Sequence, residues 1–372
     1  MTSDIVELNA ISRIGVGCYR MNQGVADHHA ALRQALELGC TLIDTAGNYG
    51  DGGSEKLVGE VLRSSSGYKA FVITKAGYIT ASAAATLQAA GIAAEELHPI
   101  SPESMYSISP DVIRIQLEES RRRLDRPMLD GLLLHNPEHY FNCEGLPSSP
   151  QAFDEAIKKA FEFLEEYIAE GKLRYYGVSS NTLASISGNR VHLERLLSLA
   201  QEVSPSHHFR LVEFPLNLVE TDALLPRANG QSLIDQIRAS GLISIANRPL
   251  NSQLGNHMIR LATYQDAPTP QLASDDYERC IDLIATQLRS ADLPHQVMDF
   301  AVMQFLRDNW QGIEHPDLVD QIFGRHFYPF AEQLWEGSLP HEVRAAFRLL
   351  HSRARQFSQL KLTDRAQQLR KE

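Results

Sequence analysis

Four residues of different chemical type stand next to short apolar runs in the sequence. Asp44, Lys75 and His135 each directly follow such a run, and Tyr49 lies in the glycine-rich loop after Asp44. An acid, an ammonium, a phenol and an imidazole form a usable proton-transfer site once the fold brings them together. A tyrosine hydroxyl, with a reference pKa of about 10, is a poor acid at neutral pH, but a neighbouring lysine cation stabilises the phenolate and lowers that pKa.

Each of the four residues receives a role from this chemistry. We expect Asp44 to hold Lys75 in place and charged, and His135 to donate a hydrogen bond that orients a carbonyl oxygen toward Tyr49. Taken singly, each residue also has an ordinary explanation as a turn, solvated, packed or core side chain. Core packing does not require four titratable types at the same end of successive strands, and we therefore favour the functional interpretation.

The elements that must position these residues alternate between strand and helix. Proline starts at Pro110 and Pro150 mark two of the helices. Strands are expected at residues 11–17, 41–44, 70–74, 129–134, 173–178, 210–214 and 242–246. Helices are expected at residues 28–38, 54–64, 110–124, 151–170, 195–202 and 232–240. Such alternation predicts a parallel sheet covered by helices, and we expect a (β/α)8 TIM barrel with the four residues at one mouth.

An eighth strand is not visible in the sequence. Residues 275–289 and 294–309 read as helices, and residues 312–313 are too short for a strand prediction. The alternative fold is an open doubly wound sheet, but its phosphate fingerprint is absent because Gly15-Val16-Gly17 lacks the third glycine.

The connection after Lys75 is unusually long. Residues 76–108 far exceed an ordinary connection of about 2 to 6 residues, so we expect a lid or covering subdomain there, with residues 81–94 helical. The barrel is expected to span residues 1–330 with this insertion included. A divergent, mostly helical C-terminal extension is expected over residues 331–372.

Composition excludes several classes of partner. A hydrophobic share of 43% with 22% charged residues is ordinary for a globular protein with a sizeable core. The net charge of -11 argues against nucleic acid and anionic membranes as the main partner. Cys18, Cys40, Cys143 and Cys280 form neither a CxxC pair for a metal nor a disulfide framework, and the N-terminus lacks a signal-like segment. We expect a cytoplasmic protein that acts on small molecules, without a metal, and the oligomeric state stays open.

The order and spacing of the motifs resemble the aldo-keto reductase superfamily from about residue 11 to 250. The resemblance rests on IDTA at 43–46, YG at 49–50, SE at 54–55, TK at 74–75, LHNPE at 134–138, GKL at 171–173 and GVSSN at 177–181. It implies that Tyr49 is the general acid/base, that Lys75 and Asp44 tune it, and that His135 orients the carbonyl. A nicotinamide cofactor would then lie extended across the barrel mouth.

The resemblance also implies a set of cofactor contacts. Ser179, Ser180 and Glu213 would contact the carboxamide, and the loop Arg248-Pro249-Leu250 would approach the pyrophosphate with its backbone. Three positions depart from the family pattern: Ser180 stands where Asn is common, Glu213 where Gln is common, and Asn247 where an aromatic ring often stacks on nicotinamide.

Recognition of the adenosine end departs most from the family. No segment resembles the family's late strand, loop and helix with an arginine for the 2′-phosphate, and Arg325 is the one plausible clamp. We therefore expect NADP(H) to be favoured and NAD(H) to be possible.

The resemblance implies an NAD(P)H-dependent oxidoreductase acting on an aldehyde, ketone or sugar carbonyl, or on the corresponding alcohol. Two alternatives are a degenerate cofactor-binding barrel that serves as a redox sensor or regulatory subunit, and a structural barrel without cofactor.

Overall fold

The structure is a computed structural model that describes residues 7–64, 68–101, 104–186, 191–227, 229–254, 257–261 and 316–324, together with 350–352, 354–355 and 358. The chain divides into two compact units. The first comprises Met1–Leu216 and Thr221–Asn247, and the second comprises Asn217–Glu220 and Arg248–Glu372. Each unit is considered by itself below.

A seven-stranded sheet forms the centre of the first unit. Its strands are β1 (Gly15–Gly17), β2 (Leu42–Asp44), β3 (Phe71–Ala76), β7 (Leu129–His135), β8 (Leu173–Ser179), β9 (Phe209–Pro215) and β10 (Ile243–Asn247), which lie in this order. Every neighbouring pair is parallel. All residues of β3 and β7 are buried, as expected for parallel strands covered on both faces.

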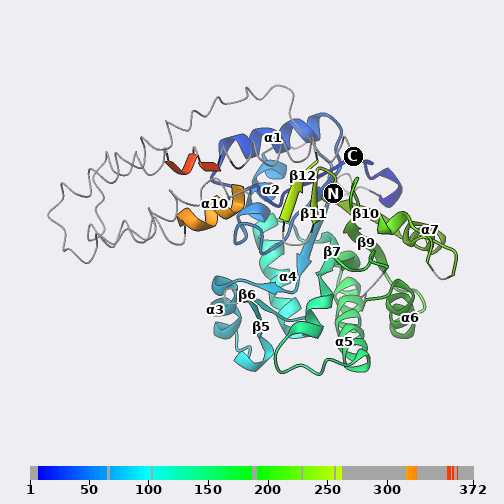
Figure 1. Cartoon of the computed structure of the whole chain (residues 1–372). Coiled ribbons are helices and arrows are strands. Elements are labelled where there is room, and N and C mark those ends of the chain that lie inside the picture. Colours follow the sequence, from blue (N-terminus) through cyan, green and yellow to red (C-terminus); the bar gives the residue numbers. More distant parts are fainter. Residues whose placement is uncertain are drawn as a thin grey trace. The chain divides into compact units, whose positions relative to one another are not determined.

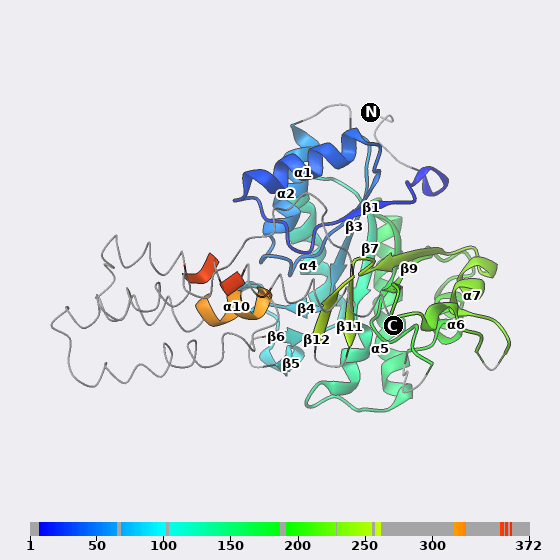
Figure 2. The same ribbon diagram turned by 45° about the horizontal axis from the view of Figure 1, so that its top comes forward.

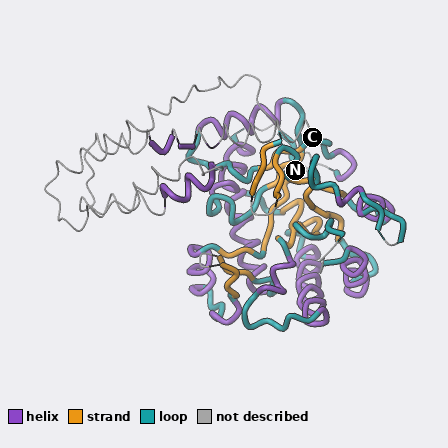
Figure 3. The backbone as a smooth tube through the Cα atoms, in the orientation of Figure 1, coloured by secondary structure: helices purple, strands orange, loops and turns teal. Residues whose placement is uncertain are grey.

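Helices follow the strands and surround them (Figures 1 and 3). They are α1 (Ala26–Glu37), α2 (Gly53–Arg63), α4 (Pro110–Leu124), α5 (Pro150–Ala169), α6 (Leu193–Val203) and α7 (Leu233–Ala239). Parallel strands in sequential order, with right-handed crossovers, place all these helices on one side of the sheet, as in a barrel. The predicted (β/α)8 barrel is confirmed, and the doubly wound alternative, which needs a reversal of strand order, is wrong. Residues 275–315, where an eighth strand and two helices were considered, lie outside the described residues.

Local sequence signals account for the helix boundaries. The N-cap side chains of Ser109 and Ser149 accept hydrogen bonds from the first turns of α4 and α5, each of which starts with proline. Ser232 and Asp235 form a capping box at the start of α7. These caps explain why the predicted boundaries of α4, α5 and α7 agree with the structure to within one residue.

The interior of the barrel is packed with apolar side chains. Phe71, Ile73, Leu133, Leu211 and Ile245 form one cluster from β3, β7, β9 and β10. A larger cluster fills the layer between the sheet and the helices. The barrel is thus a solid core, and its strand ends are the part available for a site.

Gly177 allows β8 to lie unusually close to β9. A Cβ atom at this position would come 1.7 Å from the carbonyl oxygen of Leu211, so no other residue fits without moving a strand. The register of the two strands shifts at this point, between Tyr176 and Gly177. Gly177 therefore helps to set where Ser179, two residues later, lies.

The long connection after β3 is a small folded subdomain (Figure 2). It contains β4 (Tyr78–Ile79), α3 (Ala81–Ala89), the 3-10 turn η2 (Ala94–Glu96), β5 (His98–Ser101) and β6 (Ser104–Tyr106), with an antiparallel sheet in the order β4, β6, β5. Its apolar side chains, including Leu87, pack against Val112 of α4. The helix predicted over residues 81–94 is present but ends at Ala89, because Gly91 adopts a positive φ of 94°.

Short 3-10 turns complete the first unit: η1 (Leu8–Ala10), η3 (Pro137–Asn142) and η4 (Asp222–Leu224). No helix among the described residues is long and apolar enough to cross a membrane. Cys18, Cys40 and Cys143 are free thiols, and Cys280 lies outside the described residues.

The second unit contains a hairpin and helical segments. β11 (Asn251–Leu254) and β12 (His257–Arg260) pair antiparallel, and α10 (Pro316–Ile322) follows much later in the chain. His351 stacks on Phe323, with ring centroids 4.5 Å apart, and bonds Asp320 at 2.8 Å. The predicted boundary between barrel and extension at residue 330 lies outside the described residues and stays a prediction.

Candidate active site

The predicted residues lie at one end of the barrel strands. Asp44 ends β2, Lys75 is the penultimate residue of β3, and His135 ends β7. Ser179 ends β8 and is in register with both His135 and Glu213 on the neighbouring strands. The structure thus brings together side chains that are as far as 169 positions apart, from Asp44 to Glu213.

The ammonium of Lys75 is the centre of the site. Its side chain is fully buried and donates hydrogen bonds to Asp44 Oδ1, to the backbone oxygen of Thr45 at 3.2 Å, and to Tyr49 Oη at 3.3 Å. The Lys75 ammonium also lies 5.1 Å from the centre of the Tyr49 ring. Asp44 therefore holds Lys75, and Lys75 in turn contacts the phenol, as the chemistry of the four residues predicts.

Glu213 is a second carboxylate beside Lys75. Its Oε2 lies 3.5 Å from Lys75 Nζ, and its side chain is 3% exposed. Its Oε1 accepts hydrogen bonds from Ser179 Oγ at 3.0 Å and from Asn247 Nδ2 at 2.7 Å. The sequence interpretation gave Glu213 only a contact with a carboxamide, and its ion pair with the central lysine was not foreseen.

Burial and the two carboxylates oppose the lowering effect that Lys75 has on the pKa of Tyr49. Burial raises the pKa of the Tyr49 phenol, and although Lys75 lowers that pKa, the charges of Asp44 and Glu213 raise it again. Lys75 thus lowers the Tyr49 pKa as expected, but the net direction of the shift is upward. The physical reason is that burial of the phenol, together with the charges of two carboxylates, outweighs the effect of one ammonium.

The same charges keep Lys75 protonated. Burial by itself lowers the pKa of the ammonium, but Asp44, Glu213 and Tyr49 outweigh it and raise that pKa. Burial and the nearby Glu213 raise the pKa of Asp44 to about 7, against the lowering effect of Lys75.

His135 is a neutral imidazole. Burial and the positive charge of Lys75 hold its pKa well below the usual value. Its ring centroid lies 6.0 Å from that of Tyr49, and its buried Nδ1 has no hydrogen-bond partner within the described part of the chain. A neutral imidazole can donate one hydrogen bond and accept another, as orientation of a carbonyl oxygen requires.

Further aromatic and polar side chains line this end of the strands and were not identified from the sequence. The ring of Tyr19, which is 56% exposed, packs edge-on against Tyr49 at 5.2 Å. The ring of Tyr78 packs against His135 at 4.7 Å, and its Oη bonds His139 Nε2 at 2.5 Å and accepts from Asn136 Nδ2 at 2.9 Å. These residues also follow strand ends. A search that included the four residues after each strand, and not only the residue at its end, would have found them.

Comparison with known proteins decides the family. A profile of the Aldo/keto reductase family matches residues 13–254. The chain belongs to the aldo/keto reductase family. Methylglyoxal reductase YeaE of Escherichia coli (strain K12) is 31% identical over 174 residues, which cover 46% of this chain and 46% of that protein. D-threo-aldose 1-dehydrogenase of a Pseudomonas species is 30% identical over 152 residues, which cover 41% of this chain and 43% of that protein.

The chain thus spans less than half of the length of these two curated relatives. Among solved structures, the glycerol dehydrogenase from Gluconobacter oxydans is 20% identical with a TM-score of 0.45, covering 95% of this chain and 85% of that chain. An aldo-keto reductase from Klebsiella pneumoniae in complex with NADPH is 22% identical with a TM-score of 0.39, covering 64% of each chain.

The residues expected to contact the carboxamide of the cofactor differ in whether their polar atoms already have hydrogen-bond partners. Ser180 Oγ accepts hydrogen bonds from the backbone N–H groups of Thr182 and Leu183 and so stabilises the turn after β8. Asn247 Oδ1 is buried and has no hydrogen-bond donor among the described residues, whereas Glu213 Oε2 is buried and lies 3.5 Å from the Lys75 ammonium. An acceptor without a donor beside a carboxylate suits the amino group of a primary carboxamide, so these residues fit a nicotinamide.

The residues expected at the pyrophosphate of an aldo-keto reductase cofactor belong to the second unit. Arg248 has a positive φ of 56°, and its guanidinium lies 3.3 Å from Glu220. Pro249 and Leu250 form an exposed turn. Arg325 lies outside the described residues.

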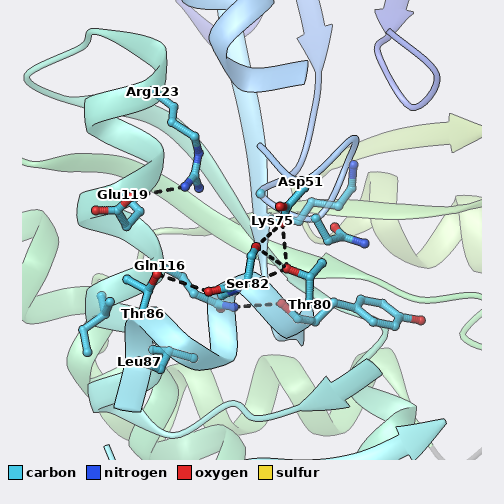
Figure 4. Close-up of a pocket in the computed structure, with 14 residues that line it drawn as sticks. Asp51, Lys75, Thr80, Ser82, Thr86, Leu87, Gln116, Glu119 and Arg123 are labelled. Atoms are coloured by element: carbon cyan, nitrogen blue, oxygen red, sulfur yellow. Dashed lines mark hydrogen bonds and ion pairs between the residues drawn. The ribbon is translucent and has the colours of Figure 1, made fainter. Parts of the chain in front are cut away.

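A cavity of about 130 Å³ lies between α3, α4 and the loop after β2, with Lys75 in its wall (Figure 4). Asp51 accepts hydrogen bonds from Thr80 Oγ1 at 2.8 Å and Ser82 Oγ at 2.6 Å. The insertion therefore contributes polar side chains next to the central lysine. Among the described residues no group of His, Cys, Asp or Glu is arranged to hold a metal ion.

Proposed function

We propose that the protein is an NAD(P)H-dependent oxidoreductase that transfers a hydride between nicotinamide and a carbonyl carbon, with Tyr49 as general acid/base. The observation that carries this proposal is the contact of 3.3 Å between the Tyr49 hydroxyl and the Lys75 ammonium, beside the neutral His135. The bound cofactor supplies or accepts the hydride. The substrate is an aldehyde, a ketone or a sugar, or the corresponding alcohol, and the names of the two curated relatives support this class.

The residues of the site supply the proton and the orientation. In the reducing direction Tyr49 gives its proton to the carbonyl oxygen, while His135 donates a hydrogen bond to the same oxygen and fixes its orientation. The Lys75 ammonium stabilises the phenolate that remains, and Asp44 keeps this ammonium in place. In the oxidising direction the same phenolate takes the alcohol proton.

Cofactor binding is proposed for the residues that the resemblance indicates. Ser179, Ser180 and Glu213 are proposed to face the carboxamide, and Arg248, Pro249 and Leu250 the pyrophosphate, with Arg325 at the adenosine end. NADP(H) is proposed as the favoured cofactor, with NAD(H) usable. The insertion is proposed to cover the substrate pocket, which its position beside Lys75 supports.

Two measurements test the proposal. Titration with NADPH and NADH, followed by nicotinamide fluorescence, separates a cofactor-binding protein from a structural barrel. Turnover with a panel of aldehydes, ketones and sugars then separates an enzyme from a sensor or regulatory subunit that binds cofactor without chemistry. Cofactor binding without turnover on any carbonyl in the panel would overturn the proposed activity.

A further inference from the structure

Two carboxyl groups surround the one ammonium at the centre of the site. Two carboxylates, Asp44 and Glu213, contact one ammonium, and His135 beside them is neutral. With both acids ionised, the described part of the site has one negative charge in excess before any ligand binds. Because the side chains of Lys75 and Glu213 are 0% and 3% exposed, water screens this excess charge poorly.

Glu213 is held in a fixed position at the end of β9. Ser179 and Asn247 donate hydrogen bonds to one carboxylate oxygen, and Lys75 lies 3.5 Å from the other. These partners come from β8, β10 and β3, so three strands fix one side chain. These contacts hold both carboxylate oxygens at the end of the strands.

We propose that Glu213 determines the redox-state preference of cofactor binding, so that the oxidised nicotinamide, whose ring carries a positive charge, binds more tightly relative to the neutral reduced form than it would beside glutamine. This inference rests on the proposed function, which places the carboxamide of the cofactor at Glu213. The buried Asn247 Oδ1, which has no donor among the described residues and lies on the residue that bonds Glu213, supports that placement. In the reducing direction, Glu213 then stabilises the charge that forms on the ring as the hydride leaves.

Coulomb's law sets the expected size of the effect. At the effective dielectric constant of about 20 that reproduces charge interactions in proteins, one added charge near a cationic ring changes its affinity roughly 10- to 100-fold. The neutral reduced ring gains little from the same charge. The ratio of the two dissociation constants therefore isolates the charge of Glu213 from losses of shape or packing.

The experiment measures dissociation constants of NADP+ and NADPH by calorimetry at one salt concentration. The parent protein is compared with Glu213→Gln, which removes the charge and keeps the shape, and with Glu213→Ala as a second uncharged variant. Glu165→Gln is the matched control, because Glu165 bonds His208 at the other end of the same strand. Melting temperatures are recorded for all four proteins.

Both uncharged variants should lose affinity for NADP+ relative to NADPH by about 10-fold or more, and Glu165→Gln should keep the parental ratio. A ratio that stays within twofold of the parental value in Glu213→Gln, or in Glu213→Ala where the first variant does not fold, overturns the inference while the proposed function stands. If the parent binds neither cofactor, the proposed function and this inference fall together.

Discussion

The Tyr49 hydroxyl lies 3.3 Å from the Lys75 ammonium. Tyr49 lies in the loop after β2, and Lys75 lies near the end of β3, the neighbouring strand. In the proposed mechanism this contact makes the phenol usable as a general acid, because the adjacent cation stabilises the phenolate left after proton transfer. Without ligand the pKa of Tyr49 is nonetheless raised, since burial and two carboxylates outweigh the lysine. We expect a bound cationic nicotinamide to lower that pKa by adding a second positive charge to the site.

Replacement of Tyr49 by Phe removes the proton donor and keeps the ring. Turnover should fall by roughly 10²- to 10⁴-fold, the usual loss for a general acid, while cofactor affinity stays near the parental value. Steady-state kinetics and a cofactor titration check this. The matched control is Tyr19→Phe, which keeps the ring packed against Tyr49 and should retain most of the activity. Parental aldehyde turnover in Tyr49→Phe would remove Tyr49 from the mechanism.

The buried neutral His135 predicts a stability that depends on pH. Its pKa is lowered in the folded protein, so below about pH 6.5 the unfolded chain takes up a proton that the folded chain does not. The contribution of His135 to the free energy of unfolding is therefore complete above that pH. It falls by about 1.4 kcal/mol per pH unit as the pH drops. His135→Gln should lose less unfolding free energy than the parent between pH 6.5 and 5.5, as measured by urea unfolding.

The exposed His192 provides the control for this measurement. His192→Gln should leave the pH dependence of unfolding as in the parent. An equal acid sensitivity in the parent and in His135→Gln would show that His135 is charged or accessible in the folded protein.

Gly177→Ala tests the close approach of β8 and β9. A Cβ 1.7 Å from the carbonyl oxygen of Leu211 must displace backbone, so we expect destabilisation of about 3 kcal/mol or more, at the upper end of the cost of overpacking. Thermal unfolding measures it. Gly17→Ala, at a strand position with no atom within 4 Å of the added Cβ, should change the melting temperature little. A parental melting temperature in Gly177→Ala would contradict the observed strand spacing.

Cofactor preference tests the weakened adenosine site. Around residue 325 the sequence offers acidic Glu314, Asp317 and Asp320 and a single candidate cation, Arg325. We expect NADPH to bind more tightly than NADH, but by well under the roughly 100-fold that about 2.7 kcal/mol of phosphate contacts would give. Dissociation constants for both cofactors at one salt concentration decide this. Strict NADPH selectivity that survives Arg325→Ala would place the phosphate contact elsewhere in the chain.

The sequence by itself determined the order of the strands and helices and the residues at the strand ends. These features are local: apolar runs of four to seven residues, the proline and serine starts of α4 and α5, and the glycines that end helices each act over a few neighbours. Since parallel strands of a barrel all end at one mouth, the position of Asp44, Lys75 and His135 in the chain was enough to predict their convergence.

Only the tertiary structure decided the charge balance of the site. Which oxygen faces which nitrogen depends on the register of β3 against β7 and of β8 against β9, and a shift by one residue turns a side chain to the opposite face. The ion pair of Lys75 with Glu213, residues 138 positions apart, therefore has no local signature. The same holds for the raised pKa of Tyr49, because desolvation and the summed field of Asp44, Glu213 and Lys75 exist only once the strands enclose them.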